Sequence, residues 1–412
     1  MRKINIIHLH VIYNNYYTGI DRYIEMYKKG MQKNSRIQTH CIFLTDSKKK
    51  LFSHITFQNG VVEAIIPMPM QDKLFFKKET FWKTKYWKVI IEIMTPYLKG
   101  MENVIFHAHN TFLIDLADLF KKQFGGKTVY HLHCLPWKYQ YNNNTAYFNK
   151  LYSAFLAKDY VGFRNLEDEC IRYEIVDKII CLSQVAKQYL MMMRQIPNEK
   201  IEIIENGLLP TKIIERNVND NIVEILFAGK VSDDKGIFEL LKALLIVHDK
   251  GYKFKLIIAG TCMKRIKDRI YNIFGMLDIQ ILGQLNINEL YNLYTTCMIG
   301  VVPSLYEQCS YVALEMSMFG VPIIVSDIDA LSEMFEDEMN ALKTPLTFDG
   351  DFGLELDKEK LANAIIRLIN DKALRLKLST NAIKNYQERF TLEKMIENTI
   401  NVYEQLIEQD NA

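Results

Sequence analysis

Two glutamates eight residues apart could act together on one ligand. Glu307 and Glu315 follow the apolar run 299–302, which suits a buried strand. Ser310 is a favoured helix N-cap and Gly320 a favoured stop, so the sequence predicts a helix that begins just after Ser310. Glu307 then lies on the loop over the strand end, and Glu315 lies within the helix, about 7 Å along its axis.

This placement suits a nucleoside diphosphate. A diphosphate can lie against backbone N–H groups at the start of the helix, near Cys309, Ser310 and Tyr311. Glu315 then reaches a ribose, because one carboxylate can accept from two vicinal hydroxyls, and Glu307 faces the sugar beyond the phosphates. The alternative is a solvated helix carboxylate. The helix neighbours of Glu315 are nearly all apolar, however, and a lone buried acid needs a partner.

A second loop carries basic residues. Gly229, Lys230, Lys235 and Gly236 follow the apolar run 222–228 and precede an amphipathic stretch. Glycines let the backbone approach a ligand closely, and lysines near a helix N-terminus favour phosphate. An ordinary strand-to-helix turn with two solvated lysines explains this loop equally well.

Short apolar runs that alternate with helix-length amphipathic stretches must position these residues. Continuous apolar runs suit strands buried on both faces, so the sequence predicts parallel sheets covered by helices. The pattern occurs twice in 412 residues, which indicates two doubly wound α/β domains. The dipeptide Asn206-Gly207 marks the break. We expect domains at 1–208 and 209–390, and a C-terminal helix, 391–412, that packs back on the first domain.

Composition limits the class of protein. The chain is 49% hydrophobic and 24% charged with a net charge of +2, which gives no support for nucleic-acid binding. Seven scattered cysteines without CxxC spacing favour reduced thiols and a cytoplasmic location. The start, MRKINIIHLH, has no small-residue cleavage site and predicts a first strand. No window of about 18 residues is free of charge, so we expect no membrane span.

The segments around the two glutamates resemble a known signature. E-x7-E, preceded by VVPSLY and followed by GVPIIVSD, resembles the GT-B fold glycosyltransferases of family 4, the retaining glycosyltransferase 1-like group. Further segments match that family along most of the chain: FAGKVSDDKG at 227–236, IIAG at 257–260, LGQL at 282–285, Asn206-Gly207, Gly19, the H-x-H at 107–109, His133 and Ser183. The resemblance implies a GT-B fold, with two Rossmann-like doubly wound domains facing across a cleft and a C-terminal helix crossing back to the first domain.

The resemblance also implies roles for matched residues. Lys230 and Lys235 are expected to bind the donor pyrophosphate and stabilise the leaving nucleoside diphosphate, where charge builds as the C–O bond breaks. Glu315 is expected to hold the ribose and Glu307 the donor sugar, while His133 lines the cleft near the transferred sugar.

The matched glycines are expected to line the donor. Gly19 and Gly229 let the backbone approach it, and Gly260 and Gly283 lie near the base. The family works without a catalytic metal and has no agreed protein nucleophile, so no cofactor is expected and a UDP- or GDP-linked sugar is the substrate. This chain departs from the family at Lys230, which replaces an arginine, at 308–310, where an aromatic-glycine pair is usual, and in having one glycine in its first loop.

We therefore expect a retaining glycosyltransferase. It would move a hexose-type sugar from a nucleotide-diphosphate sugar to a glycan, lipid-linked or protein-linked acceptor, in surface polysaccharide or glycoconjugate synthesis. The alternative is a non-catalytic partner subunit of a glycosyltransferase complex. The presence of Lys230, Lys235, Glu307 and Glu315 favours an active chain.

Two other patterns each have two interpretations. The pairs His107/His109 and His131/His133 could hold zinc, but no helical zinc motif supports this, and a sugar cleft suits His133 better. The stretch 71–90 carries six lysines and two acids among six aromatic residues. It suits peripheral contact with the inner membrane surface or, equally, a helical insertion packed on the first domain.

Overall fold

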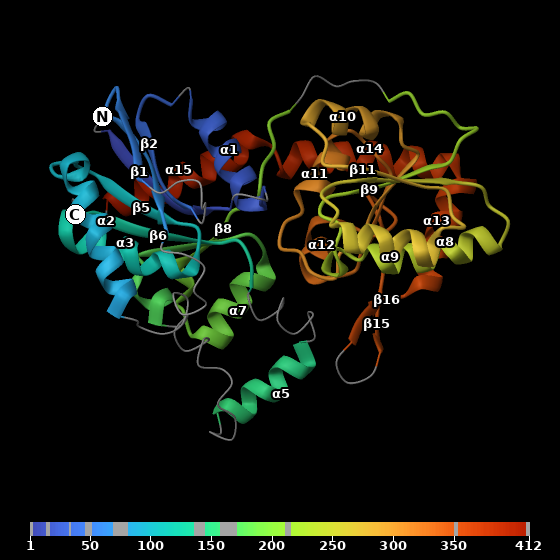
Figure 1. The fold of residues 1–412 in the computed structure, drawn as a ribbon, viewed down its shortest axis with the longest axis horizontal. Helices are drawn as coiled ribbons and strands as arrows, with labels where there is room; N and C mark the ends of the chain where they lie inside the picture. Colours follow the sequence, from blue (N-terminus) through green and yellow to red (C-terminus); the bar gives the residue numbers. More distant parts are fainter. Residues whose placement is uncertain are drawn as a thin grey trace. The chain divides into compact units, whose positions relative to one another are not determined.

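The computed structural model forms two compact units. It describes residues 3–13, 17–32, 34–45, 52–68, 81–135, 145–156, 171–210, 216–349 and 353–408. Unit 1 comprises Met1–His133, Lys158–Gly207 and Leu392–Ala412, and unit 2 comprises Cys134–Ala157 and Leu208–Thr391. Each unit is built on one large sheet of mainly parallel strands with helices packed on it, which confirms the predicted α/β class (Figure 1).

Unit 1 has an eight-stranded sheet in the order β3-β4-β2-β1-β5-β6-β7-β8, parallel except where β3 meets β4. The strands are β1 (Ile4–Ile12), β2 (Ile37–Thr45), β3 (His54–Gln58), β4 (Val61–Pro67), β5 (Val104–Ala108), β6 (Lys127–Leu132), β7 (Lys178–Cys181) and β8 (Ile201–Ile203). The helices are α1 (Gly19–Met31), α2 (Phe81–Leu98), α3 (Ile114–Phe124), α7 (Gln184–Arg194) and α15 (Leu392–Glu408), with 3₁₀ turns at Thr111–Leu113 and Asn198–Lys200.

The helix α15 packs on α1 within unit 1. A Cβ atom built on Gly30 of α1 would lie only 2.3 Å from Ile396 Cγ1 of α15, so glycine permits the close approach of the two helices. Tyr403 of α15 hydrogen-bonds through its hydroxyl to His107 Nδ1 of β5, at 2.6 Å. The helix therefore contributes to the core of unit 1.

Unit 2 has a six-stranded parallel sheet in the order β11-β10-β9-β12-β13-β14 and a separate antiparallel pair, β15-β16. The strands are β9 (Glu224–Ala228), β10 (Lys255–Ala259), β11 (Ile279–Gly283), β12 (Ile299–Val302), β13 (Ile323–Ser326), β14 (Leu342–Thr344), β15 (Leu346–Asp349) and β16 (Gly353–Leu356). The helices are α5 (Thr145–Leu156), α8 (Ile237–Asp249), α9 (Lys264–Phe274), α10 (Ile287–Thr296), α11 (Tyr311–Met318), α12 (Asp329–Met334), α13 (Lys358–Asn370) and α14 (Lys372–Arg389), with a 3₁₀ turn at Asp233–Lys235.

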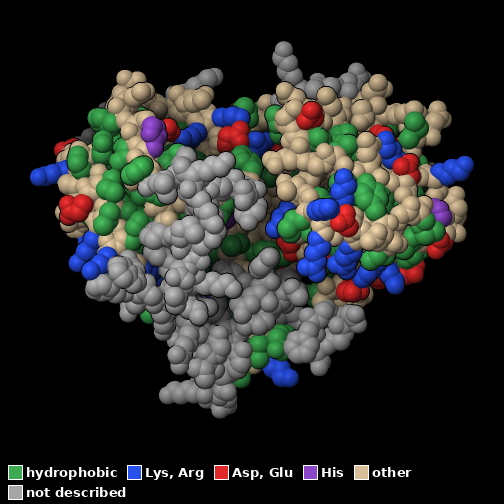
Figure 2. Space-filling view, viewed as in Figure 1, with side chains coloured by type: hydrophobic (Ala, Val, Ile, Leu, Met, Phe, Trp, Pro, Cys, Tyr) green, Lys and Arg blue, Asp and Glu red, His purple; other side chains and the backbone are tan. Residues whose placement is uncertain are grey.

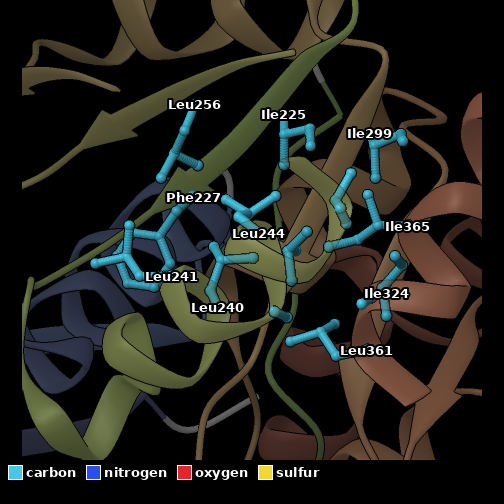
Figure 3. Packing of buried hydrophobic residues seen from close by; sticks show 14 of the residues in the cluster. Ile225, Phe227, Leu240, Leu241, Leu244, Leu256, Ile299, Ile324, Leu361 and Ile365 are labelled. Carbon is cyan, nitrogen blue, oxygen red and sulfur yellow. The ribbon is translucent and has the colours of Figure 1, made fainter. Parts of the chain in front are cut away.

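One apolar cluster joins this sheet to the helices on one of its faces. Figure 3 shows Ile225 and Phe227 of β9 packed with Leu240, Leu241 and Leu244 of α8. Residues of β10, β12, β13, β14, β16, α9, α13 and α14 also belong to the cluster, and Figure 1 shows α8, α9 and α13 on the same side of the sheet. Burying each large aliphatic side chain stabilises the fold by roughly 1.5–3 kcal/mol. This packing fixes the strand ends that carry the candidate site.

The predicted helix after Glu307 forms where its cap residue indicated. Helix α11 begins at Tyr311, and Ser310 Oγ accepts a hydrogen bond from the Ala313 N–H at 3.4 Å. Gly320 has φ +66°, in the left-handed region that a helix stop favours. Glu307 therefore lies on the loop between β12 and α11, as predicted.

Candidate active site

An ion pair joins the loops that follow β9 and β12. Lys235 Nζ lies 2.5 Å from Glu307 Oε1, and the same oxygen accepts a hydrogen bond from Ser304 Oγ at 3.1 Å. Lys235 ends the 3₁₀ turn after β9, while Ser304 and Glu307 lie beyond β12. Because β9 and β12 are parallel neighbours, their carboxyl ends lie at the same edge of the sheet. The fold thus pairs two of the predicted site residues.

A small pocket surrounds this ion pair. Its wall comes from both strand ends and the start of α11: Phe227, Ala228, Gly229, Lys235, Val302, Pro303, Ser304, Glu307, Ser310 and Val312. The Lys235 side chain is 30% exposed, so solvent and a ligand can reach its ammonium group. A diphosphate in this pocket would meet both that cation and the N-terminal turn of α11.

Three glycines that the sequence predicted to line the donor, Gly229, Gly260 and Gly283, lie side by side at this edge of the sheet. The Gly229 N–H donates to Ala259 O at 2.9 Å, and the Gly260 N–H donates to Gly283 O at 2.7 Å. A Cβ atom on Gly260 would lie 1.8 Å from Gly229 O, so no larger residue fits there without a backbone shift. The glycines therefore keep the ends of β9, β10 and β11 close together.

Gly236 holds the turn after β9 against the loop after β12. Its φ is +70°, and a Cβ atom there would lie 1.8 Å from Pro303 O. The Leu305 N–H also donates to Asp234 O at 2.9 Å. These contacts set the positions of Lys235 and Glu307 relative to each other.

Glu315 has the partner that a buried acid requires. Tyr294 of α10 donates its hydroxyl to Glu315 Oε2 at 3.0 Å, and both side chains are buried. Burial raises the pKa of Tyr294 well above its usual range, and the charge of Glu315 adds to this, so the hydroxyl stays protonated and able to donate. The hydrogen bond orients the Glu315 carboxylate one helical turn beyond the cap of α11.

The remaining residues of unit 2 that were predicted to bind the donor lie near the start of α11 and beyond the end of β9. Cys309 and Ser310 are buried at the start of α11, and Tyr311 is half-buried as its first residue. Lys230 is exposed beyond the end of β9 and, among the described residues, forms no ion pair. The structure therefore brings Lys235, not Lys230, to Glu307.

Of the predicted residues of unit 1, Gly19 lies at the start of a helix and His133 lies just after a strand. Gly19 begins α1 after the N-cap Thr18, is exposed, and has nothing within 4 Å of a built Cβ atom. His133 follows β6 and contacts His109, with His133 Nε2 2.9 Å from His109 Nδ1. Burial lowers the pKa of His133 well below its usual value, and His10 and His107 add to this, so its imidazole is neutral.

Part of the basic aromatic stretch 71–90 falls outside the described residues, which resume at 81 with α2. Within α2, Trp87 is buried, and Lys83 is buried in an ion pair with Asp115. Lys85 and Lys88 are exposed. Some of these side chains thus stabilise unit 1. Across the described ranges, no helix combines the length and apolarity needed to cross a bilayer.

Positive charge also gathers on α9 in unit 2, where Figure 2 shows a cluster of basic side chains. Lys264, Arg265, Lys267 and Arg269 of this helix are all exposed. Arg269 lies over the Phe238 ring, 3.9 Å from its centroid. None of the four lines the pocket around Lys235, so the cation in that pocket is supplied by the turn after β9.

Sequence reasoning missed three residues of this region. Ser304 shares Glu307 with Lys235, and Tyr294 holds Glu315. Tyr306 accepts a hydrogen bond from the Leu135 N–H at 2.5 Å, which ties the loop before Glu307 to the start of the 134–157 segment. Ser304 lies in the quoted signature and could have been proposed as a partner. Tyr294 lies on a different helix, and no spacing pattern points to it.

Comparison with known proteins identifies part of the chain. Residues 211–385 match the family described as Glycosyl transferases group 1. The chain is 28% identical over 241 residues to an uncharacterized glycosyltransferase of Methanocaldococcus jannaschii, which is 55% of this chain and 59% of that protein. It is 25% identical over 220 residues to the capsular polysaccharide biosynthesis glycosyltransferase CapM of Staphylococcus aureus, 53% of each. The chain thus spans little more than half the length of these curated relatives.

Solved structures match the fold along the whole chain. Sucrose-phosphate synthase from Thermosynechococcus elongatus matches with a TM-score of 0.76 at 18% identity, covering 99% of this chain and 100% of that one. Anabaena HepE in complex with UDP-glucose matches with a TM-score of 0.67 at 14% identity, covering 97% and 99%. These matches confirm the predicted GT-B fold. Residues 211–385 therefore resemble the glycosyl transferases group 1 family, within a chain that has the GT-B fold.

Proposed function

We propose that this protein transfers a hexose-type sugar from a UDP- or GDP-linked donor, with retention of configuration, to a glycan, lipid-linked or protein-linked acceptor. The observation that carries the proposal is the Lys235–Glu307 ion pair beside Ser304, at the joined ends of β9 and β12. The pocket holds one cation for phosphate and one carboxylate for sugar hydroxyls. Glu315, held by Tyr294, supplies the carboxylate for the ribose.

The proposed chemistry follows from where charge develops. As the bond from the sugar to the diphosphate breaks, negative charge builds on the leaving phosphate, and a fixed cation stabilises it. Lys235 is the proposed cation, assisted by Lys230 and the first turn of α11. Glu307 accepts hydrogen bonds from the donor sugar and keeps the Lys235 ammonium in place. Glu307 is not proposed as a nucleophile, because its carboxylate already accepts from Lys235 and Ser304.

Relatives support the substrate class and the pathway. Among the matched structures, HepE was solved with UDP-glucose, and among the curated relatives CapM acts in capsular polysaccharide biosynthesis. We therefore propose a UDP-linked sugar as the first donor to test and surface polysaccharide synthesis as the setting. In unit 1, His133 is the residue proposed to face the transferred sugar, and Gly19 the one proposed to approach its phosphate.

A matched pair of variants tests this proposal. Glu307→Gln removes the carboxylate from the proposed site, and Glu338→Gln removes one from an ion pair of equal length, Glu338–Arg367 at 2.5 Å, elsewhere in unit 2. Release of nucleoside diphosphate from a panel of nucleotide sugars is the readout. We expect Glu307→Gln to lower kcat/KM by about 100-fold and Glu338→Gln to leave it unchanged. Equal losses in the two variants would contradict the assignment.

A binding screen separates an active enzyme from a partner subunit. An intact donor at 100 times its Kd should stabilise the protein by about 2.7 kcal/mol, which a thermal-shift assay detects. Binding without turnover, even with a candidate partner protein present, would favour the non-catalytic subunit. Co-sedimentation with anionic vesicles at low salt tests peripheral membrane contact through 71–90, and no binding would remove that proposal.

A further inference from the structure

Six histidines lie together on, or just after, three neighbouring strands of unit 1. Each strand end contributes two histidines, two residues apart, so both side chains of a pair point to the same face of the sheet. Strand β1 pairs with β5 so that His8 lies opposite His107, and β5 pairs with β6. The six residues are His8, His10, His107, His109, His131 and His133.

Their imidazole rings are close enough to share a ligand. His8 Nδ1 lies 2.8 Å from His109 Nε2, deep in the unit. The rings of His107 and His109 stack with centroids 4.4 Å apart. His8, His107 and His109 each offer one nitrogen, and these three nitrogens lie within 4.8 Å of one another. A zinc ion with Zn–N bonds of about 2.0–2.1 Å places tetrahedral ligand atoms roughly 3.4 Å apart, a distance that small ring movements reach.

Several of these buried ring nitrogens have no partner. His8 Nε2, His107 Nε2 and both nitrogens of His131 are buried without a hydrogen bond. A neutral imidazole has one donor and one acceptor nitrogen, and leaving either unmatched in the interior is costly. An apolar residue would fill the same space without that cost. A metal ion bound through His107 Nε2 would give one of these unpartnered nitrogens a ligand.

A hydrogen bond to Tyr403 decides which ring nitrogen of His107 remains available to a ligand. Tyr403 occupies His107 Nδ1 through a 2.6 Å hydrogen bond, which leaves Nε2 as the free ligand atom. Holding the second ring nitrogen in this way is typical of metal-binding histidines. His10 is different, because Asp21 and Asn110 occupy its two nitrogens at 3.0 and 3.1 Å. His10 is therefore left out of the ligand set.

We propose that His8, His107 and His109 bind one divalent transition-metal ion, with zinc as the best match to three imidazole ligands. The ion is held by His8 Nδ1, His107 Nε2 and His109 Nε2, and the 2.8 Å contact between His8 and His109 is then two ligands converging on one ion. His109 Nδ1 keeps its proton and donates to His133 Nε2, 2.9 Å away. The site would join β1 to β5 and fix the tautomer of His133.

Metal content tests the proposal independently of transfer activity. Protein without a polyhistidine tag is dialysed and its zinc measured by mass spectrometry. We expect about one ion per chain in the natural sequence and less than about 0.2 in His107→Asn and His109→Asn. The control is His40→Asn: His40 is buried in the same unit, but Asn5 and the Val62 N–H occupy its two nitrogens. This control should keep the ion.

Measurements on the natural sequence decide the question if the variants do not fold. After chelation, added Zn²⁺ should raise Tm by about 5 °C, and added Co²⁺ should give visible absorption bands of a tetrahedral nitrogen-ligated site. No bound metal, no Co²⁺ bands and no thermal shift would overturn the proposal in favour of hydrogen-bonded neutral imidazoles. Retention of the ion in His107→Asn with its loss in His131→Asn would also overturn it, since the ion would then belong to His109, His131 and His133.

Discussion

Replacing Gly236 with alanine should damage both the stability and the proposed donor site of unit 2. Gly236 is the N-cap residue of α8 and has φ +70°, where an L side chain is strained by roughly 1–2 kcal/mol. The new Cβ atom would also lie 1.8 Å from Pro303 O and 2.7 Å from Pro303 C. These are backbone atoms, so rotating a side chain cannot relieve the contact. The loop that carries Ser304 and Glu307 must move instead.

A control variant at the other end of the same helix separates the cost of backbone strain from the cost of steric overlap. Gly251 follows the C-cap of α8 with φ +86°, and nothing lies within 4 Å of its built Cβ atom. Gly251→Ala should therefore cost only the backbone strain, about 1–2 kcal/mol. Gly236→Ala adds the steric overlap, and overpacking of this kind costs roughly 1–3 kcal/mol more. We expect a total loss of about 2–5 kcal/mol for Gly236→Ala.

Two assays check this expectation. Urea unfolding followed by circular dichroism measures the free energy of unfolding of each variant. Release of nucleoside diphosphate measures the donor site, and Gly236→Ala should raise KM for the donor while Gly251→Ala leaves it unchanged. If both variants lost the same stability and kept the same KM, the close packing of Gly236 against Pro303 would be refuted.

Three further predictions test other contacts. Burial, aided by Lys3, lowers the pKa of His40 to about 4 from 6.5, so the unfolded chain binds its proton first as pH falls through this window. Between pH 7.5 and pH 4, the free energy of unfolding of the natural protein should fall by about 3 kcal/mol more than that of His40→Asn. Parallel curves of unfolding free energy against pH for the two proteins would contradict this. Arg216→Met leaves three backbone carbonyl oxygens without the guanidinium group that donates to all of them. In urea unfolding this change should destabilise unit 2 by about 3 kcal/mol. An unchanged unfolding midpoint would show that these hydrogen bonds do not stabilise the unit. Tyr294→Phe removes the hydrogen bond to Glu315 and should weaken nucleoside-diphosphate binding about fivefold by calorimetry, and unaltered affinity would show that Tyr294 does not position the carboxylate.

Short sequence patterns predicted much of the fold. Continuous apolar runs predicted the strands of both large sheets except β3 and β14, because a strand buried on both faces leaves a clear pattern. The sequence did not predict β3, whose five residues are exposed or half-buried and pair antiparallel only with β4. The β15-β16 pair was missed for a similar reason, since each strand has only four residues. Short strands at a sheet edge or outside a sheet show no long apolar run.

Site residues were predictable where the information was local. The Ser310 cap and Gly320 stop identified α11 and so separated Glu307 from Glu315. Pairing between distant residues was not predictable in the same way. The Lys235–Glu307 contact spans 72 positions, and it follows from β9 and β12 being neighbours, which spacing alone does not specify. Tyr294 reaches Glu315 from another helix for the same reason.

The place of α15 in unit 1 has a consequence for synthesis on the ribosome. Its Tyr403 and Ile396 complete the packing around β5 and α1, yet they follow all of unit 2 in the chain. Nascent β1 and α1 therefore emerge long before the helix that covers them. Unit 2 can finish folding first, while unit 1 waits with apolar surface exposed to chaperones.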